Sequence, residues 1–173
     1  LSSLILLPSI GSFFLFFTKS NKENNITVKY VALFTSLANF FLSIYLWILF
    51  DQSTSDFQFV EDRVWIKDLI NYKVGIDGIS ILFILLTTFI TPLCIVSVNN
   101  SIKIRLREFL IAVLIMESFM IGVFCSLDLV VFYLFFEAGL IPMFLIIGIW
   151  GGDRRVYSAF KFFLYTLLGS VLM

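Results

Sequence analysis

Long apolar segments separated by short polar connections make up most of the chain, from its first residue to its last. Each segment is close to the ~20 residues that an α-helix needs to cross the ~30 Å hydrocarbon core of a bilayer. We therefore predict a single membrane domain with an all-α, polytopic fold of about six transmembrane helices. These helices are expected over residues 1–18, 28–50, 76–98, 109–126, 129–150 and 156–173, with an outer loop over residues 51–75.

Basic residues gather in the first, third and fifth connections, namely Lys19, Lys22, Lys29, Lys103, Arg105, Arg107, Arg154 and Arg155. The longer second connection carries both signs of charge, with Arg63, Lys67 and Lys73 against Asp51, Asp56, Glu61, Asp62 and Asp68. Short loops rich in Lys and Arg stay on the inner side of a membrane. We expect these three connections inside and the N-terminus outside.

The outer loop interleaves apolar side chains with its charges, among them Phe57, Phe59, Trp65 and Tyr72. One interpretation is an interfacial segment whose Trp and Tyr lie at the level of the lipid headgroups. The other is a docking surface for a neighbouring subunit. The sequence leaves both interpretations open.

Composition supports a membrane protein, because 60% of the residues are hydrophobic, 14% are charged and the mean hydropathy is +1.03. Soluble domains are less apolar and carry more charge. The net charge is zero and no basic stripe is present, so nucleic acid is not expected as a partner. The chain has no histidine, which excludes His-ligated haem, His-based zinc sites and a Ser-His triad within it.

Two cysteines, Cys94 and Cys125, lie within apolar runs and are interpreted as small core residues. Two cysteines so placed make neither a disulfide framework nor a metal motif. We therefore expect no metal and no cofactor in this chain.

Two carboxyl groups are predicted deep in the membrane, where a charged side chain costs about 2.5–3.5 kcal/mol. Glu117 and Glu137 each lie near the ninth residue of their predicted helices, ~12 Å from the helix start and close to the midplane. Almost no loop joins the two helices, so they are expected to be antiparallel neighbours, and the two carboxyl groups could lie at similar depth. Burial favours the neutral form of a carboxylic acid, and a second carboxylate nearby does so further. Such a group can take up and release protons, as a proton relay requires.

The residues that follow Glu137 support a functional role for it. Pro142 lacks an N–H and crowds the carbonyl of Ala138, so we expect a helix kink there. Gly139 lies in the same turn and allows close approach of backbone or water. A freed carbonyl in a membrane interior can bind water or a partner helix.

The other polar residues of the apolar segments have simpler interpretations beside a functional one. Glu117 could be a relay member, or could hydrogen-bond to a neighbouring helix. Lys161 is also a possible relay member, although a lysine near a helix start can extend to the interface. Asp77 is interpreted as an acid at a helix N-terminus that complements the helix dipole, and Asp128 as an interface residue or the N-cap of the fifth helix. Pro92 is interpreted as a kink.

Four motifs carry a resemblance to a known family: residues 134–143 (LFFEAGLIPM), 148–152 (GIWGG), 161–170 (KFFLYTLLGS) and 74–80 (VGIDGIS). Together they resemble the antiporter-like, proton-pumping subunits of respiratory complex I, and most closely the subunit 4 branch. The resemblance is strong from Asp77 onward and looser before it. It implies a membrane-arm subunit of NADH:ubiquinone oxidoreductase that contributes to proton translocation and holds no redox centre.

The same resemblance implies roles for particular residues. In the family, a glutamate on helix five pairs with a lysine on helix seven, and Glu137 falls on that glutamate. Lys161 falls in the family's KFF stretch, whereas Glu117 matches none of the family positions that we could assign. The family's helices form inverted repeats with broken helices, and this chain stops in helix six. We therefore expect the N-terminal part of the antiporter-like fold, with helix seven onward supplied by a second chain or a missing segment.

The expected partners are the other membrane-arm subunits and phospholipid, in the mitochondrial inner membrane or alternatively the bacterial inner membrane. Two other functions stay open. The chain could belong to a multi-subunit cation/proton antiporter of shared ancestry, or could be a non-pumping half-subunit with a structural or assembly role.

Overall fold

The computed structural model describes residues 1–18, 25–51, 53–54, 56–66, 70–98, 102 and 104–172 of the 173-residue chain. Its helices are α1 (Ser2–Phe17), α2 (Asn25–Leu49), α3 (Gly78–Ser97), α4 (Leu106–Cys125), α5 (Leu129–Trp150) and α6 (Arg155–Leu172). The predicted six-helix bundle is confirmed. Three helices begin earlier than predicted: α2 at Asn25 and α4 at Leu106, each by three residues, and α6 at Arg155, by one residue.

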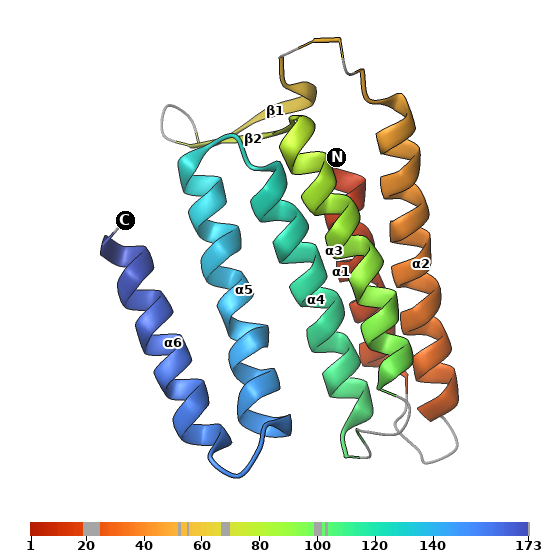
Figure 1. Cartoon of the computed structure of the whole chain (residues 1–173), viewed down its shortest axis with the longest axis vertical. Helices are drawn as coiled ribbons and strands as arrows, with labels where there is room; N and C mark the ends of the chain where they lie inside the picture. Colours follow the sequence, from red (N-terminus) through yellow and green to blue (C-terminus); the bar gives the residue numbers. More distant parts are fainter. Residues whose placement is uncertain are drawn as a thin grey trace.

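Helix α4 is the centre of the bundle (Figure 1). It packs against α1, α3 and α5, and also contacts α2. Helix α6 packs on α5 at one edge, and α2 lies on the opposite side of α4 (Figure 1). Residues 126–128 are enough to join α4 to α5, which makes these helices antiparallel neighbours, as the short fourth connection predicted.

The outer loop contains an antiparallel β-hairpin, which the sequence pattern did not predict. Strand β1 (Gln58–Ile66) pairs with β2 (Ile70–Ile76), and Glu61 lies opposite Val74. The hairpin covers the upper ends of α4 and α5 (Figure 1). The buried side chains of Val74 and Ile76 pack into the bundle core, and the Leu127 amide donates to the Lys73 carbonyl at 3.0 Å. The hairpin is therefore a cap over the α4–α5 junction.

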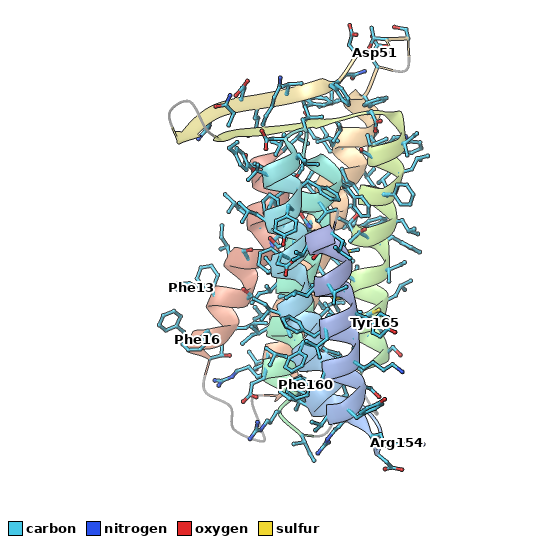
Figure 2. The ribbon with its side chains drawn as sticks, turned by 90° about the vertical axis from the view of Figure 1, so that its left-hand side faces the viewer. Phe13, Phe16, Asp51, Arg154, Phe160 and Tyr165 are labelled. Carbon is cyan, nitrogen blue, oxygen red and sulfur yellow. The ribbon has the colours of Figure 1, made fainter. Side chains whose placement is uncertain are left out.

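Four helices in the described part of the chain are long and apolar enough to cross a bilayer: α2, α3, α4 and α5. Helix α1 is apolar but shorter, with 16 residues, and α6 carries Arg155 and Lys161. Large apolar side chains cover the outside of the bundle, and Figure 2 shows Phe13 and Phe16 pointing outward from α1. Such a surface is typical of contact with lipid or with a neighbouring subunit.

The two ends of the bundle differ in charge as predicted. At the end opposite the hairpin lie the described basic residues Lys29, Arg105, Arg107, Arg154 and Arg155. At the hairpin end lie Asp51, Asp56, Glu61 and Asp62, with Arg63 and Lys73, and Figure 2 shows Asp51 and Arg154 at opposite ends. The predicted loop residues Lys19, Lys22, Lys67, Asp68 and Lys103 lie outside the described residues.

The two cysteines do not share one environment. Cys125 is fully buried in the core cluster beneath the hairpin, as expected, but Cys94 is exposed on α3. The interpretation of Cys94 as a core residue was wrong. Its place in an apolar run did not reveal its direction, because the lipid-facing side of a membrane helix is as apolar as the packed side.

Close helix packing depends on two glycines. A Cβ atom built on Gly122 of α4 would lie 2.7 Å from the ring of Phe135 on α5, and one built on Gly11 of α1 would lie 2.8 Å from the Thr35 side chain on α2. Neither separation leaves room for a methyl group. Small residues at such crossings let two helices approach closely in a membrane, where dispersion contacts replace the hydrophobic effect.

We expect Gly122→Ala to lower the free energy of unfolding by about 1–3 kcal/mol relative to Gly148→Ala, because only the first substitution overpacks a helix contact. A Cβ on Gly148 meets Ala159 at an ordinary 3.6 Å. Both substitutions gain the same helix propensity, so the difference between them isolates the clash with Phe135. Thermal unfolding of the protein in detergent measures it, and equal stability of the two variants would contradict the packing described.

Candidate functional site

Glu137 lies on α5 and faces α6. Its carboxylate oxygen Oε2 accepts a hydrogen bond from the Ser170 hydroxyl at 3.0 Å, and its side chain is half-buried. It follows Leu129, the first residue of α5, by two turns, which places it ~12 Å below the hairpin end of the helix. The α5–α6 interface therefore presents a carboxyl group at membrane depth with one hydroxyl partner.

Ser170 is a site residue that the sequence did not predict. Its hydroxyl also lies 2.9 Å from the Leu167 carbonyl in the preceding turn, an alternative acceptor for the same proton. A hydroxyl that can donate either to its own helix or to Glu137 can respond to the charge of that carboxyl group. The signal in the sequence was weak, because the hydroxyl of a single serine in an apolar helix more often donates its hydrogen bond to a carbonyl of the same helix.

The N-terminus of α5 is held by Asp128, as predicted. The Asp128 carboxylate accepts from the backbone amides of Val130 at 2.8 Å and Val131 at 3.3 Å. Asp77 caps α3 in the same way, accepting from the Ser80 amide at 2.6 Å, and this hydrogen bond lowers the pKa of Asp77. Each cap satisfies amides that have no partner within their helix.

Pro142 is buried within α5, which continues as one helix from Leu129 to Trp150. The proline removes one backbone donor, so the Ala138 carbonyl loses its ordinary helical partner. A Cβ on Gly139 would meet the Phe119 side chain at an ordinary 3.8 Å, so the space beside this glycine would admit a methyl group. The kink at Gly139 and Pro142 stays a prediction.

Ala138 also lines a cavity of about 780 Å³ among α1, α4, α5 and the hairpin. Its lining is mostly apolar, with polar groups from Ser2, Ser9, Ser118, Tyr72 and Arg63. The Ser9 and Ser118 hydroxyls are 2.8 Å apart, and Ser118 donates to the Ile5 carbonyl. The cavity thus joins the face of α5 next to Glu137 to a line of hydroxyl groups.

Glu117 lies on α4 but faces the other flank of the bundle. It is 1% exposed, and its Oε1 accepts from the Asn39 side chain of α2 at 2.9 Å. Eight residues separate Glu117 from the end of α4 at Cys125, so it lies at nearly the same depth as Glu137. The two carboxyl groups nevertheless engage helices on opposite sides of the α4–α5 pair (Figure 1).

Lys161 is exposed on α6, near the basic end of the bundle, with its ammonium group 5.9 Å from the centre of the Tyr157 ring. It forms no ion pair within the described part of the chain. This placement agrees with a lysine that extends to the membrane interface. Its role as a relay member stays a prediction.

Glu61 of β1 ties the hairpin to the start of α1. It accepts hydrogen bonds from the Ser2 amide at 3.1 Å and from the Ser2 hydroxyl. Burial alone would raise the pKa of Glu61, but the hydrogen bonds that it accepts from Ser2 lower it. Burial raises the pKa of the neighbouring Tyr72. Among the described residues, no group of three or more Cys, Asp or Glu side chains is placed to hold a metal ion.

Known proteins resemble this chain in sequence and in structure. The family model described as NADH:quinone oxidoreductase/Mrp antiporter, transmembrane, matches residues 126–173, which include α5 and α6. NADH-quinone oxidoreductase subunit M of Rhodobacter capsulatus is 61% identical over 145 residues, covering 84% of this chain and 28% of that protein. NADH-ubiquinone oxidoreductase chain 4 of Marchantia polymorpha is 48% identical over 175 residues, covering 100% of this chain and 35% of that protein.

A solved structure has the same fold. A chain of respiratory complex I from Thermus thermophilus with bound NADH superposes with a TM-score of 0.79 at 27% identity, over 97% of this chain and 33% of that chain. This chain therefore spans about a third of the length of the proteins that it matches.

Replacing Asp128 by alanine is expected to speed hydrogen exchange at the amides of Val130 and Val131 about fivefold, because loss of an N-cap costs about 1 kcal/mol. Asp128→Asn keeps a side-chain oxygen acceptor and should exchange nearly as slowly as the unmodified protein. Hydrogen–deuterium exchange with mass spectrometry on the start of α5 measures both. Equal acceleration in the two variants would show that charge, and not the cap, holds this end of the helix.

Proposed function

We propose that this chain, a homologue of the antiporter-like subunits of NADH:quinone oxidoreductase, forms part of the membrane arm of that enzyme and supplies Glu137 to proton translocation. The observation that carries the proposal is a carboxyl group at membrane depth in α5, within the segment that the family model matches. The relatives are about three times as long as this chain, so the remainder of the pump would come from a segment or a chain beyond these residues.

The chemistry assigned to Glu137 is reversible protonation. Its carboxylate accepts a hydrogen bond from the Ser170 hydroxyl of the neighbouring helix α6. A cation moved toward Glu137 would favour release of its proton, and withdrawal of the cation would favour uptake. The family resemblance assigns that cation to a lysine on helix seven. Helix α6 leaves much of its apolar surface exposed, including Leu164 and Leu168, which supports a further helix beside it.

We propose the other membrane-arm subunits and phospholipid as partners, and the mitochondrial inner membrane, or alternatively the bacterial inner membrane, as the location. Electron transfer would take place in other subunits, with no redox centre and no cofactor in this chain. The charge asymmetry supports an orientation with the hairpin outside and the Arg154–Arg155 loop inside. Glu117 and Lys161 would be additional relay members only if protons also pass through α4 or α6.

A subunit of a multi-subunit cation/proton antiporter is the second candidate, because the matching family model covers both groups of proteins. The names of the relatives favour the oxidoreductase. Copurification with flavin and iron–sulfur subunits would support the first function, and their absence from a stable complex would support the second. A structural half-subunit predicts full pumping without the Glu137 carboxyl group.

We expect Glu137→Gln to abolish or strongly reduce the number of protons translocated per NADH oxidised, because the glutamine amide cannot bind and release a proton. The measurement is proton uptake by vesicles that contain the whole reconstituted complex. Glu108→Gln is the matched control, since Glu108 is an exposed carboxylate at the start of α4, 3.8 Å from Arg105. Unchanged stoichiometry in the Glu137 variant would refute the assignment.

A further inference from the structure

A buried polar contact joins α2 to α4 on the side of the bundle away from Glu137. Among the described residues that are buried and polar, Glu117 is the ionisable one, and its partner Asn39 is fully buried. The Asn39 amide Nδ2 donates to Glu117 Oε1 at 2.9 Å. The function proposed above assigns no role to Asn39, and the contact depends on neither a helix terminus nor a loop.

Glu117 and Asn39 each have one further oxygen atom, which takes no part in the contact described above. Glu117 Oε2 and Asn39 Oδ1 are both buried without a hydrogen bond among the described residues. An ionised carboxylate only accepts hydrogen bonds, and so does the oxygen of a carboxamide. With Glu117 ionised, the contact would therefore hold two buried acceptors without a donor, together with a charge near the bilayer midplane. Buried polar groups in proteins are rarely left in that state.

A single proton satisfies both oxygens. A neutral carboxyl group presents one O–H donor and one carbonyl acceptor, and a carboxamide presents an N–H donor and a carbonyl acceptor in the same plane. Side by side, the two groups can form a pair of opposed hydrogen bonds, from Glu117 Oε2–H to Asn39 Oδ1 and from Asn39 Nδ2–H to Glu117 Oε1. Rotating the Asn39 amide by 180° does not remove the need for this proton, because Asn39 Oδ1 would then face an oxygen of Glu117.

The charged groups on the elements packed against α4 offer no substitute for this proton. Helix α1 has no charged side chain, and α3 has none. Lys29 of α2 is ten residues before Asn39, ~15 Å along the helix toward the basic end. Lys73 of β2 is exposed at the hairpin end, and Glu137 of α5 is directed to Ser170. The titratable tyrosines of these elements are Tyr30, Tyr45, Tyr72 and Tyr133.

We propose that Glu117 and Asn39 form a second proton-binding site, in which Asn39 holds Glu117 as a neutral carboxylic acid and the shared proton ties α2 to α4. The site is separate from Glu137, and it stands whether or not Glu137 carries translocated protons. Asn39 acts here as a positioning residue for the protonated acid. Within the bundle, the pair gives α2 a specific polar anchor on the central helix, in addition to the apolar contacts around it.

The test is infrared difference spectroscopy on the whole complex in membranes at neutral pH, comparing the unmodified protein with Glu117→Gln. We expect the variant to lose a carbonyl-stretch band of a protonated carboxylic acid, and to keep its thermal transition, because glutamine can form the same two hydrogen bonds with Asn39. A spectrum without that loss means that Glu117 is ionised, and overturns the proposal. A large fall in the thermal transition temperature of the Glu117→Gln variant also overturns the proposal, because it shows that the structure needs an ionised Glu117.

Two further variants guard the interpretation. Asn39→Leu removes the partner but not the acid, so the carbonyl band should shift in frequency, and an unshifted band would overturn the role of Asn39. This variant also decides the question if Glu117→Gln fails to assemble. Glu108→Gln, which changes an exposed carboxylate on the same helix, is expected to leave the band unchanged. Loss of pumping in the Glu137→Gln variant would not alter any of these spectra, so the two proposals can fail separately.

Discussion

The structure depends on one constraint, which is that a polar group within the hydrocarbon core must find its partner inside the protein, because no bulk water is available to it. Most hydroxyl groups satisfy this constraint within their own helix. Thr88 and Thr166, for example, donate to carbonyls in the preceding turn. The groups that cannot do so, such as carboxyl and carboxamide side chains, must be matched across helices. These few matches add specific polar contacts to helices that also pack through apolar side chains.

The same constraint explains the ends of the helices. Asp77 and Asp128 satisfy the first amides of α3 and α5 at the hairpin end, and β2 supplies the Lys73 carbonyl to the amide of Leu127 in the α4–α5 junction. The hairpin therefore covers the point where two helices end with unpaired backbone groups. Anchoring of the hairpin through Glu61 and Ser2 holds this cover against α1. The junction that leads into Glu137 is thus fixed from several directions.

Two carboxyl groups, one on α4 and one on α5, lie at almost the same depth but face opposite sides of the bundle. Glu117 is enclosed by α2 and α4 and has a partner that suits a neutral acid, whereas Glu137 is half-buried between α5 and α6 and has a hydroxyl partner. Their environments suit different tasks. The proposals above assign a bound proton and a helix contact to the enclosed Glu117, and reversible protonation to Glu137 at the α5–α6 interface.

The sequence by itself determined the number and approximate extent of the helices, the charge difference between the two ends, and the depth of Glu117 and Glu137, because these properties follow from segment length and from the position of charges along the chain. The motif around Glu137 also indicated a resemblance to the antiporter-like subunits, because residue identities alone define such a motif. Only the tertiary structure decided which way each side chain faces. Membrane helices are apolar on every side, because lipid and protein core are equally apolar. No periodic pattern in the sequence therefore showed that Cys94 faces outward, that Glu117 contacts Asn39, or that Ser170 contacts Glu137. The hairpin, too, required the structure, because the burial of Val74 and Ile76 depends on helix ends far away in the sequence.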